Sequence, residues 1–189
     1  MLPIANPLRR LTGALALGAL FAFGAAFSAT AQQLITLNAP AMVTSIGQSR
    51  DGDALQKAVM RAGVEPSYDD KFEPKDFGDT KTLFIAVGAD PGVDMKAETE
   101  RAGRLLAEAR KLDIAVVMVH MGGKARRDAK TDDLIKLVGP KSDLIMILAD
   151  SDEDGMIKKL ATSSGIPLRE ARSAAFLSEL IKGGFGSGS

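Results

Sequence analysis

Three short and almost wholly apolar runs place the strongest constraint on how this chain folds. They occupy residues 82–87, where only Thr82 is polar, residues 114–119 and residues 144–148. A strand that is apolar at every position is typical of a parallel sheet covered on both faces. Segments with helical periodicity lie between these runs, the best defined being residues 94–112, and this alternation predicts a three-layer α/β fold.

Two further strands complete the predicted sheet. One spans residues 41–46, and the other spans residues 64–68 and belongs at an edge, because Pro66 has no N–H for a central ladder. Further helices are expected over residues 53–62, from Thr131 onward, from a cap at Ser151 to about 163, and over residues 169–181. The sequence therefore predicts a mostly parallel, five-stranded sheet of flavodoxin-like or Rossmann-like type.

Residues 1–31 have the pattern of a cleavable export signal. Arg9 and Arg10 form a basic start, an apolar stretch covers residues 11–27, and Ala29-Thr30-Ala31 is the small-x-small pattern that signal peptidases cleave. A transmembrane anchor is the alternative, but the stretch is shorter than the roughly 20 residues that a bilayer span needs. The two arginines are also compatible with the twin-arginine route. We expect cleavage after Ala31 and a periplasmic or secreted protein without a membrane span.

The remaining chain has the size and composition of one ordinary domain. We expect that domain over residues 32–182, followed by a disordered Gly/Ser tail over residues 183–189. Since the chain has no cysteine, its stability must come from packing rather than disulfides. Without the two signal arginines it keeps 24 − 2 = 22 basic and 24 acidic residues, a balance that argues against nucleic-acid binding.

The loop after the first strand is a candidate ligand site. In open α/β sheets, ligands bind beyond the carboxyl ends of the strands, near the point where the strand order reverses. This loop offers hydroxyls, an amide side chain and a glycine close to a helix N-terminus, where an anion is stabilised. The candidate residues are Ser45, Gly47, Gln48 and Ser49. The alternative is a plain turn in which the serines cap the helix.

The loop after the fourth strand carries the most distinctive residues. The only histidine, His120, stands where a buried strand ends, and Gly122 and Gly123 let the backbone approach another group closely. Arg126 and Arg127 add planar donors suited to carboxylate or phosphate. We interpret these five residues as ligand-binding, although a strand-end histidine that bonds a backbone carbonyl and two solvated arginines would give the same pattern.

An acidic cluster follows the fifth strand. Residues 150–155 match the opening D-x-D-x-D-G of a calcium loop, but Ala161 stands where the bidentate glutamate belongs. Acidic residues at a helix N-terminus are explained better by capping, so no metal is predicted. Asp150 is kept as a candidate binding residue, since it comes at the very end of the strand, and a pairing with an arginine of the preceding loop is left open. The loop at residues 88–92 is interpreted as a tight turn.

These motifs resemble those of an exported family known as a domain of unknown function. The shared features are T-S-x-G-Q-S at residues 44–49, H-x-G-G-x-x-R-R at residues 120–127 and E-D-G at residues 153–155. The resemblance implies a single three-layer α/β domain outside the cytoplasm and implies no activity. Such proteins are expected to carry a Gly-, Ser- and Lys-rich loop after the third strand, where this chain has Asp90-Pro91-Gly92.

The leading functional hypothesis is a module that binds a small anionic ligand or presents it to a periplasmic protein partner. A second hypothesis is a hydrolase or transferase in which His120 is the general base, Ser45 or Ser49 the nucleophile and Asp150 the group that orients the histidine. A third is a subunit that docks a protein partner. Flavin binding is disfavoured, because Trp is absent and Tyr68 is the single tyrosine, so no cofactor is predicted.

Overall fold

Six parallel strands form the centre of the domain. They are β1 (Ala41–Ile46), β2 (Ser67–Tyr68), β3 (Thr82–Val87), β4 (Ala115–His120), β5 (Leu144–Leu148) and β6 (Leu168–Ala171). The computed structural model describes residues 35–123 and 126–186, all of which belong to one compact unit, Gln32–Ser189. The predicted export signal at residues 1–31 lies outside the described residues, as do residues 187–189 of the predicted tail.

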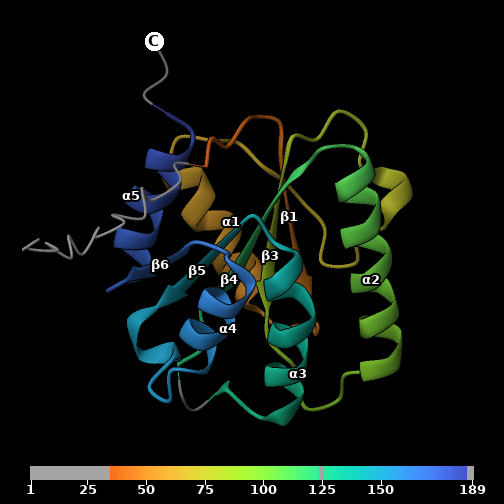
Figure 1. The fold of residues 1–189 in the computed structure, drawn as a ribbon. Coiled ribbons are helices and arrows are strands. Elements are labelled where there is room, and N and C mark those ends of the chain that lie inside the picture. Colours follow the sequence, from red (N-terminus) through yellow and green to blue (C-terminus); the bar gives the residue numbers. More distant parts are fainter. Residues whose placement is uncertain (1–34, 124–125, 187–189) are drawn as a thin grey trace, which may run out of the picture. The chain divides into compact units, whose positions relative to one another are not determined.

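The strands lie in the order β2-β1-β3-β4-β5-β6 (Figure 1). Every neighbouring pair is parallel, so all six strands end at the same edge of the sheet. This is the flavodoxin-like order with one strand added, and the order reverses between β1 and β3. The predicted α/β class and parallel sheet are confirmed.

Helices cover both faces of the sheet, as predicted. Helices α1 (Asp51–Arg61) and α5 (Ala174–Gly184) lie on one face, while α2 (Met95–Lys111), α3 (Ala129–Val138) and α4 (Met156–Ser164) lie on the other (Figure 1). Each face of the sheet therefore has its own core. The core under α1 and α5 includes Leu55, Val59, Leu177 and Ile181, which are all fully buried.

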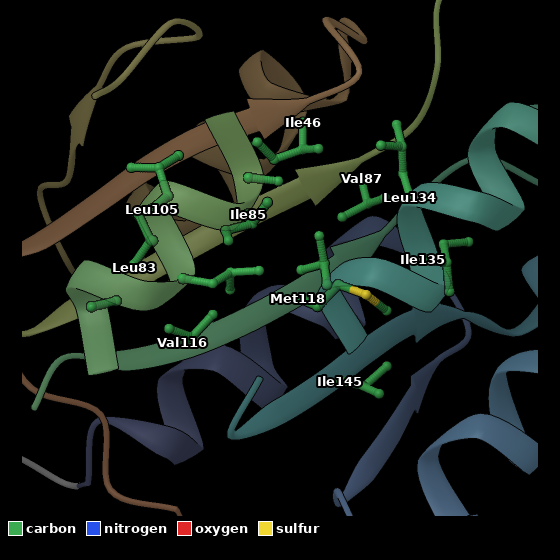
Figure 2. Close-up of a cluster of buried hydrophobic side chains, with 14 of the residues drawn as sticks. Ile46, Leu83, Ile85, Val87, Leu105, Val116, Met118, Leu134, Ile135 and Ile145 are labelled. Atoms are coloured by element: carbon green, nitrogen blue, oxygen red, sulfur yellow. The ribbon is translucent and has the colours of Figure 1, made fainter. Parts of the chain in front are cut away.

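The core under α2, α3 and α4 is drawn in Figure 2. Side chains of the central strands, such as Ile85 and Met118, pack against Leu105 of α2 and Leu134 of α3, and all four are at most 1% exposed. Because every residue of β1 and β3 is buried, these two strands lose their solvent contact on both faces. Burial on both faces explains why their sequences are nearly apolar throughout.

The sheet has six strands rather than the predicted five. Residues 168–171 form β6 beside β5, whereas the sequence prediction began the last helix at Arg169. Arg169 and Glu170 are good helix formers, and the segment lacks a hydrophobic alternation that would mark a strand. Pairing with β5 overrides these local preferences. The last helix begins later, at Ala174, where Ser173 Oγ accepts a hydrogen bond from Phe176 N.

Two other helices begin elsewhere than predicted. Helix α3 begins at Ala129 with Asp128 as its cap, because the Asp128 carboxylate accepts from Thr131 N, the residue predicted to be the cap. Helix α4 begins at Met156 rather than after Ser151. Asp152 supplies its cap by accepting from the N–H groups of Ile157 and Lys158 at 2.7 and 2.9 Å.

The ordered chain continues beyond Lys182, where the disordered tail was expected to begin. Gly184 is the last residue of α5, and its carbonyl accepts a hydrogen bond from Leu37 N at 2.7 Å. The half-buried ring of Phe185 stacks on Phe84 of β3, with 6.2 Å between ring centroids. The C-terminal residues thus tie α5 to the start of the domain and to the central sheet.

We predict that Phe185→Ala lowers the free energy of unfolding by about 2 kcal/mol, because it removes a half-buried ring and an aromatic pair. Phe176→Ala is the matched control, since Phe176 is 38% exposed and contacts only the Arg172 guanidinium among aromatic and cationic partners. Its effect should stay below about 1 kcal/mol. Urea unfolding of both variants measures the difference, and equal effects would contradict the packing role of Phe185.

Candidate functional site

The loops after β1 and β3 touch where the strand order reverses. Gly88 N donates to Ile46 O at 3.1 Å, and Asp90 N donates to Gly47 O at 2.9 Å. A Cβ on Gly47 would lie 2.2 Å from Gly88 O, and the φ of Gly47 is +93°, so only glycine fits there. The following residue, Gln48, also has a positive φ of 59°. The strained turn after β1 is therefore fixed against β3.

A buried ion pair from α2 holds this turn in place. The Glu98 carboxylate accepts from Gly47 N at 2.8 Å and from Gln48 Nε2 at 3.4 Å. Arg101 bonds the same carboxylate, at 2.7 Å between Nη2 and Oε2, and also donates to the carbonyl oxygens of Ser45 and Phe72. Both side chains are less than 8% exposed. Burial by itself would raise the pKa of Glu98, but the Arg101 guanidinium and the Gly47 N–H outweigh it and lower that pKa.

Glu98 and Arg101 were not among the residues singled out from the sequence. Helical spacing could have identified Glu98, because it places this residue on the same stripe as Ala102, Leu105 and Ala109. A charged residue on an apolar stripe marks either a buried pair or a site. Here it marks the support of a candidate loop.

His120 ends β4 and is completely buried. Its Nδ1 lies 2.8 Å from Val87 O, so the carbonyl of the neighbouring strand orients the ring. The enzyme hypothesis had given this orienting role to Asp150. Burial lowers the pKa of His120, and the nearby arginines 126 and 127 add to that effect, while the Val87 carbonyl and Asp51 oppose it. The imidazole is therefore neutral near neutral pH.

The loop after His120 brings Arg126 to Asp51, the first residue of α1. Arg126 Nη1 lies 2.8 Å from Asp51 Oδ1, and the side chain of Arg126 is 49% exposed while that of Asp51 is 9% exposed. A Cβ on Gly122 would lie 2.8 Å from Arg126 Cβ and 3.3 Å from His120 Cε1. Glycine at this position therefore lets both the arginine stem and the histidine ring lie close to the backbone of residue 122. Lys124 and Ala125 of the same loop lie outside the described residues.

Arg127 is engaged differently from its neighbour. Its guanidinium bonds Asp132 at 2.9 Å and both oxygens of Asp154 at 2.7 and 3.0 Å, and it lies 3.5 Å from Asp152. These carboxylates raise the pKa of Arg127, and the pairing lowers the pKa of Asp154 to about 2. The side chain is only 8% exposed. Arg127 therefore fastens the loop after β4 to the turn before α4.

The acidic cluster is accordingly divided between capping and pairing. Asp152 caps α4, and Asp154 pairs with Arg127. Within residues 35–123 and 126–186, no group of three or more potential metal-ligating side chains is found. Asp150 is exposed and stands over Gly123, where a Cβ would lie 2.8 Å from Asp150 Oδ2. In the described part of the chain, Arg126 pairs instead with Asp51, and Arg127 pairs with Asp132 and Asp154.

The two candidate serines are placed differently with respect to the histidine. Ser45 shares a strand face with Val43, which belongs to the core under α1 and α5, whereas His120 shares its face with Met118 of the opposite core. Ser49 is buried in the loop, and its hydroxyl accepts from Asp51 N at 3.2 Å. The structure therefore brings together Gly47, Gln48, Ser49, Asp51, His120, Gly122, Gly123 and Arg126 around the ends of β1, β3 and β4.

Buried polar atoms without a partner are concentrated at this edge. In the described part of the chain, four buried side-chain atoms lack a hydrogen-bond partner: Thr44 Oγ1, Ser45 Oγ, His120 Nε2 and Ser151 Oγ. Thr44 and Ser45 lie near the end of β1, His120 ends β4, and Ser151 follows β5. An unpaired buried polar group costs about 1–3 kcal/mol, so each of these atoms is a candidate for a hydrogen bond to a ligand or to water.

The cavities in the surface do not by themselves point to the carboxyl edge. One of about 650 Å³ opens at the opposite edge, where Lys81, Ile114 and Asp143 precede their strands. One of about 300 Å³ lies at the carboxyl edge and is lined by Arg127, Asp132 and Ser151. Volume alone would favour the opposite edge. The unpartnered atoms and the reversal of strand order favour the carboxyl edge, because ligands in open α/β sheets bind where the strand order reverses.

A family model described as a domain of unknown function, DUF6305, matches residues 38–185. The chain belongs to this family. The match covers the sheet, all five helices and every candidate site residue, so the site lies within the DUF6305 domain. No curated protein and no solved structure matches the chain. Among the described residues of this DUF6305 member, none of the helices has the length and apolarity of a membrane span.

We predict that Glu98→Gln lowers the free energy of unfolding by about 3 kcal/mol, because it leaves the Arg101 charge buried without its counter-ion. The control is Glu73→Gln, which breaks an exposed pair with Arg104 and should cost less than about 1 kcal/mol. Chemical denaturation of both variants provides the measurement. Similar small losses for both would show that the buried pair does not support the loop.

The same pair predicts a pH dependence with a definite sign. Since the pKa of Glu98 is lower in the folded protein than its ordinary value of 4.5, its contribution is complete above pH 4.5. The contribution is lost as the pH falls through the folded-state pKa. The stability gap between the unmodified protein and Glu98→Gln should therefore narrow below pH 4.5, and a gap that widens there would contradict this assignment.

Proposed function

We propose that this chain is exported and that its DUF6305 domain binds a small anionic ligand at the carboxyl edge of the sheet. The observation that carries the proposal is the buried, unpartnered Nε2 of His120, close to the half-exposed Arg126. A guanidinium has five N–H donors. One donor of Arg126 reaches Asp51, which leaves others to meet a ligand above the histidine.

The surrounding charges set limits on that ligand. Asp51 neutralises part of the Arg126 charge, and Asp150 stands nearby over Gly123. The N-terminus of α1 and Arg50 at its cap position contribute positive potential. A small anion fits this balance, whereas a polyphosphate would meet two carboxylates.

The enzyme hypothesis has no specific observation in its favour. A nucleophile must lie within hydrogen-bond reach of its base. Ser45 lies on the other face of the sheet from His120, and the Ser49 hydroxyl bonds the backbone of Asp51. We therefore develop the binding function alone, and a protein partner that occupies this edge becomes an outcome of the test below.

Arg126 gives a sharper test than a change of both arginines, because Arg127 holds the loop itself. A protein that begins at Gln32 keeps both cores and is suited to a thermal-shift screen. The panel contains inorganic phosphate, sulfate, acetate, dicarboxylates, amino acids and nucleotides. A ligand present at about 100 times its Kd should add roughly 2.7 kcal/mol of stability and raise the melting temperature.

Arg126→Gln should abolish that shift and leave the unliganded fold intact. The control is Arg104→Gln, which removes an exposed arginine of α2 that pairs with Glu73 and should leave the shift unchanged. A shift that survives in the Arg126 variant would place the ligand elsewhere. If no anion raises the melting temperature of the unmodified protein, the binding proposal fails and a protein partner becomes the better explanation of this edge.

Export is tested separately. Produced from residues 1–189 in a bacterium with a periplasm, the protein should be recovered from the periplasm with Gln32 as its first residue. Ala31→Leu should block cleavage, because the signal peptidase needs a small residue there, whereas Thr30→Leu at the unrestricted middle position should not. Intact mass and N-terminal sequencing distinguish the forms. Recovery of uncleaved, cytoplasmic protein from the unmodified sequence would refute the export proposal.

A further inference from the structure

The proton on His120 has a fixed place. Nδ1 lies 2.8 Å from the Val87 carbonyl oxygen, and a carbonyl can only accept a hydrogen bond. Nδ1 therefore carries the proton and donates it. In a neutral ring the other nitrogen, Nε2, then presents a lone pair and acts as an acceptor. A group that meets Nε2 in a hydrogen bond must bring a hydrogen of its own.

Burial keeps the ring in this neutral form. His120 is completely buried, and the arginines at positions 126 and 127 are the positive groups that act on it. Asp51 is the negative group that acts on it and favours protonation, but the effect of burial is larger. A protonated ring would offer a donor at Nε2 and would bind any oxyanion. The neutral ring is selective.

The carboxylates near His120 also require a hydrogen-bond donor from the ligand. Asp51 presents its Oδ2 near Gly88, where a Cβ would lie 3.4 Å away, while its Oδ1 is used by Arg126. Asp150 presents a carboxylate over Gly123. The edge therefore combines one guanidinium with three acceptors: His120 Nε2, Asp51 and Asp150. An oxyanion without hydrogens would accept hydrogen bonds from the guanidinium. At the three acceptors, however, its lone pairs would face other lone pairs, and no hydrogen bond would form.

We infer that the ligand is an oxyanion that keeps a proton, as hydrogen phosphate does, and that His120 Nε2 accepts that proton in a hydrogen bond. This inference rests on the proposed anion site and adds the chemical class of its ligand. Arg126 binds the anionic oxygens of the ligand, and the P–OH group turns toward the histidine. No covalent step is involved. Gly122 and Gly123 let Arg126 and Asp150 lie close to the backbone of this loop, where a Cβ would meet each of them at 2.8 Å.

Sulfate is the decisive comparison, because it has nearly the shape of phosphate but no proton at neutral pH. Sites that hydrogen-bond a particular ligand group reject analogues that lack it by large factors, since the buried partner is left unpaired. We expect inorganic phosphate to bind at least about tenfold more tightly than sulfate. Titration calorimetry on the unmodified protein from Gln32 measures both constants at about pH 7.5, above the second pKa of about 6 of a phosphate monoester.

Methyl phosphate distinguishes free phosphate from a phosphorylated metabolite as the source of this chemistry. At the same pH the monoester has lost its last proton, while inorganic phosphate keeps one. If the proton is what the site recognises, methyl phosphate should bind as weakly as sulfate. Methyl phosphate that binds as tightly as inorganic phosphate would overturn the role of the proton.

The single histidine allows a direct observation of the hydrogen bond. Protein labelled with ¹⁵N-histidine gives one pair of ring-nitrogen signals, so no assignment is needed. In the free protein Nδ1 should be of the protonated type and Nε2 of the unprotonated type. Phosphate should shift Nε2 toward the protonated position and leave Nδ1 in place, and sulfate should move neither. A protonated Nε2 in the free protein, or an Nε2 that does not move at saturating phosphate, would overturn the inference.

His120→Gln tests the selectivity from the protein side. The glutamine amide can both donate and accept, so the preference for phosphate over sulfate should fall toward onefold. The melting temperature of the unliganded variant is measured alongside, and the comparisons on the unmodified protein do not depend on this variant folding. Equal binding of phosphate and sulfate to the unmodified protein would overturn the inference and leave the anion site standing. Failure of both to bind, together with all other anions, would overturn the proposed function itself.

Discussion

The buried ion pair of Glu98 and Arg101 fixes the geometry on which the carboxyl edge depends. It joins α2 to the Gly47 N–H and the Ser45 carbonyl, and so holds the turn after β1 at the point where the strand order reverses. A buried pair contributes little to stability compared with an apolar replacement, but its loss leaves a charge without a partner. Here the pair fixes the position of the loop. It holds the Gly47 backbone against Gly88, and Ser49 and Asp51 follow directly after this contact.

Much of the fold follows from the sequence, because the central strands are apolar at nearly every position. Strands that are buried on both faces have continuous apolar sequences. For residues 82–87 and 144–148, both ends of the strand were predicted correctly. Strand β6 was missed for the opposite reason. It lies at an edge and carries Arg169 and Glu170, so its identity comes from pairing with β5 and not from its own pattern. The observed starts of some helices differ from the predicted ones, because a helix cap requires particular backbone angles. Gly155, the residue before α4, has a positive φ.

The positions of the candidate residues in the fold were predictable, but their contacts were not. The position of His120 at a strand end and the loop after β1 follow from the rule that ligands bind beyond the carboxyl ends of strands. The sequence gives no means of separating Arg126 from Arg127, since the difference lies in their partners. Asp132 and Asp154 surround one, while the other reaches only Asp51, which is 75 positions away. Arg127 is therefore enclosed by carboxylates, whereas the side chain of Arg126 is half-exposed.

The two ends of the sheet also affect how one molecule meets another. Strand β2 is only two residues long, and β6 is four residues long with a charge at each central position. Two copies that paired antiparallel through β6 about an axis at Arg169 or at Glu170 would set like charges directly opposite each other, which is unfavourable. Short, charged edges discourage the strand-to-strand association to which open sheets are prone. The ends of this sheet therefore oppose pairing of two copies in the registers that place like charges opposite each other.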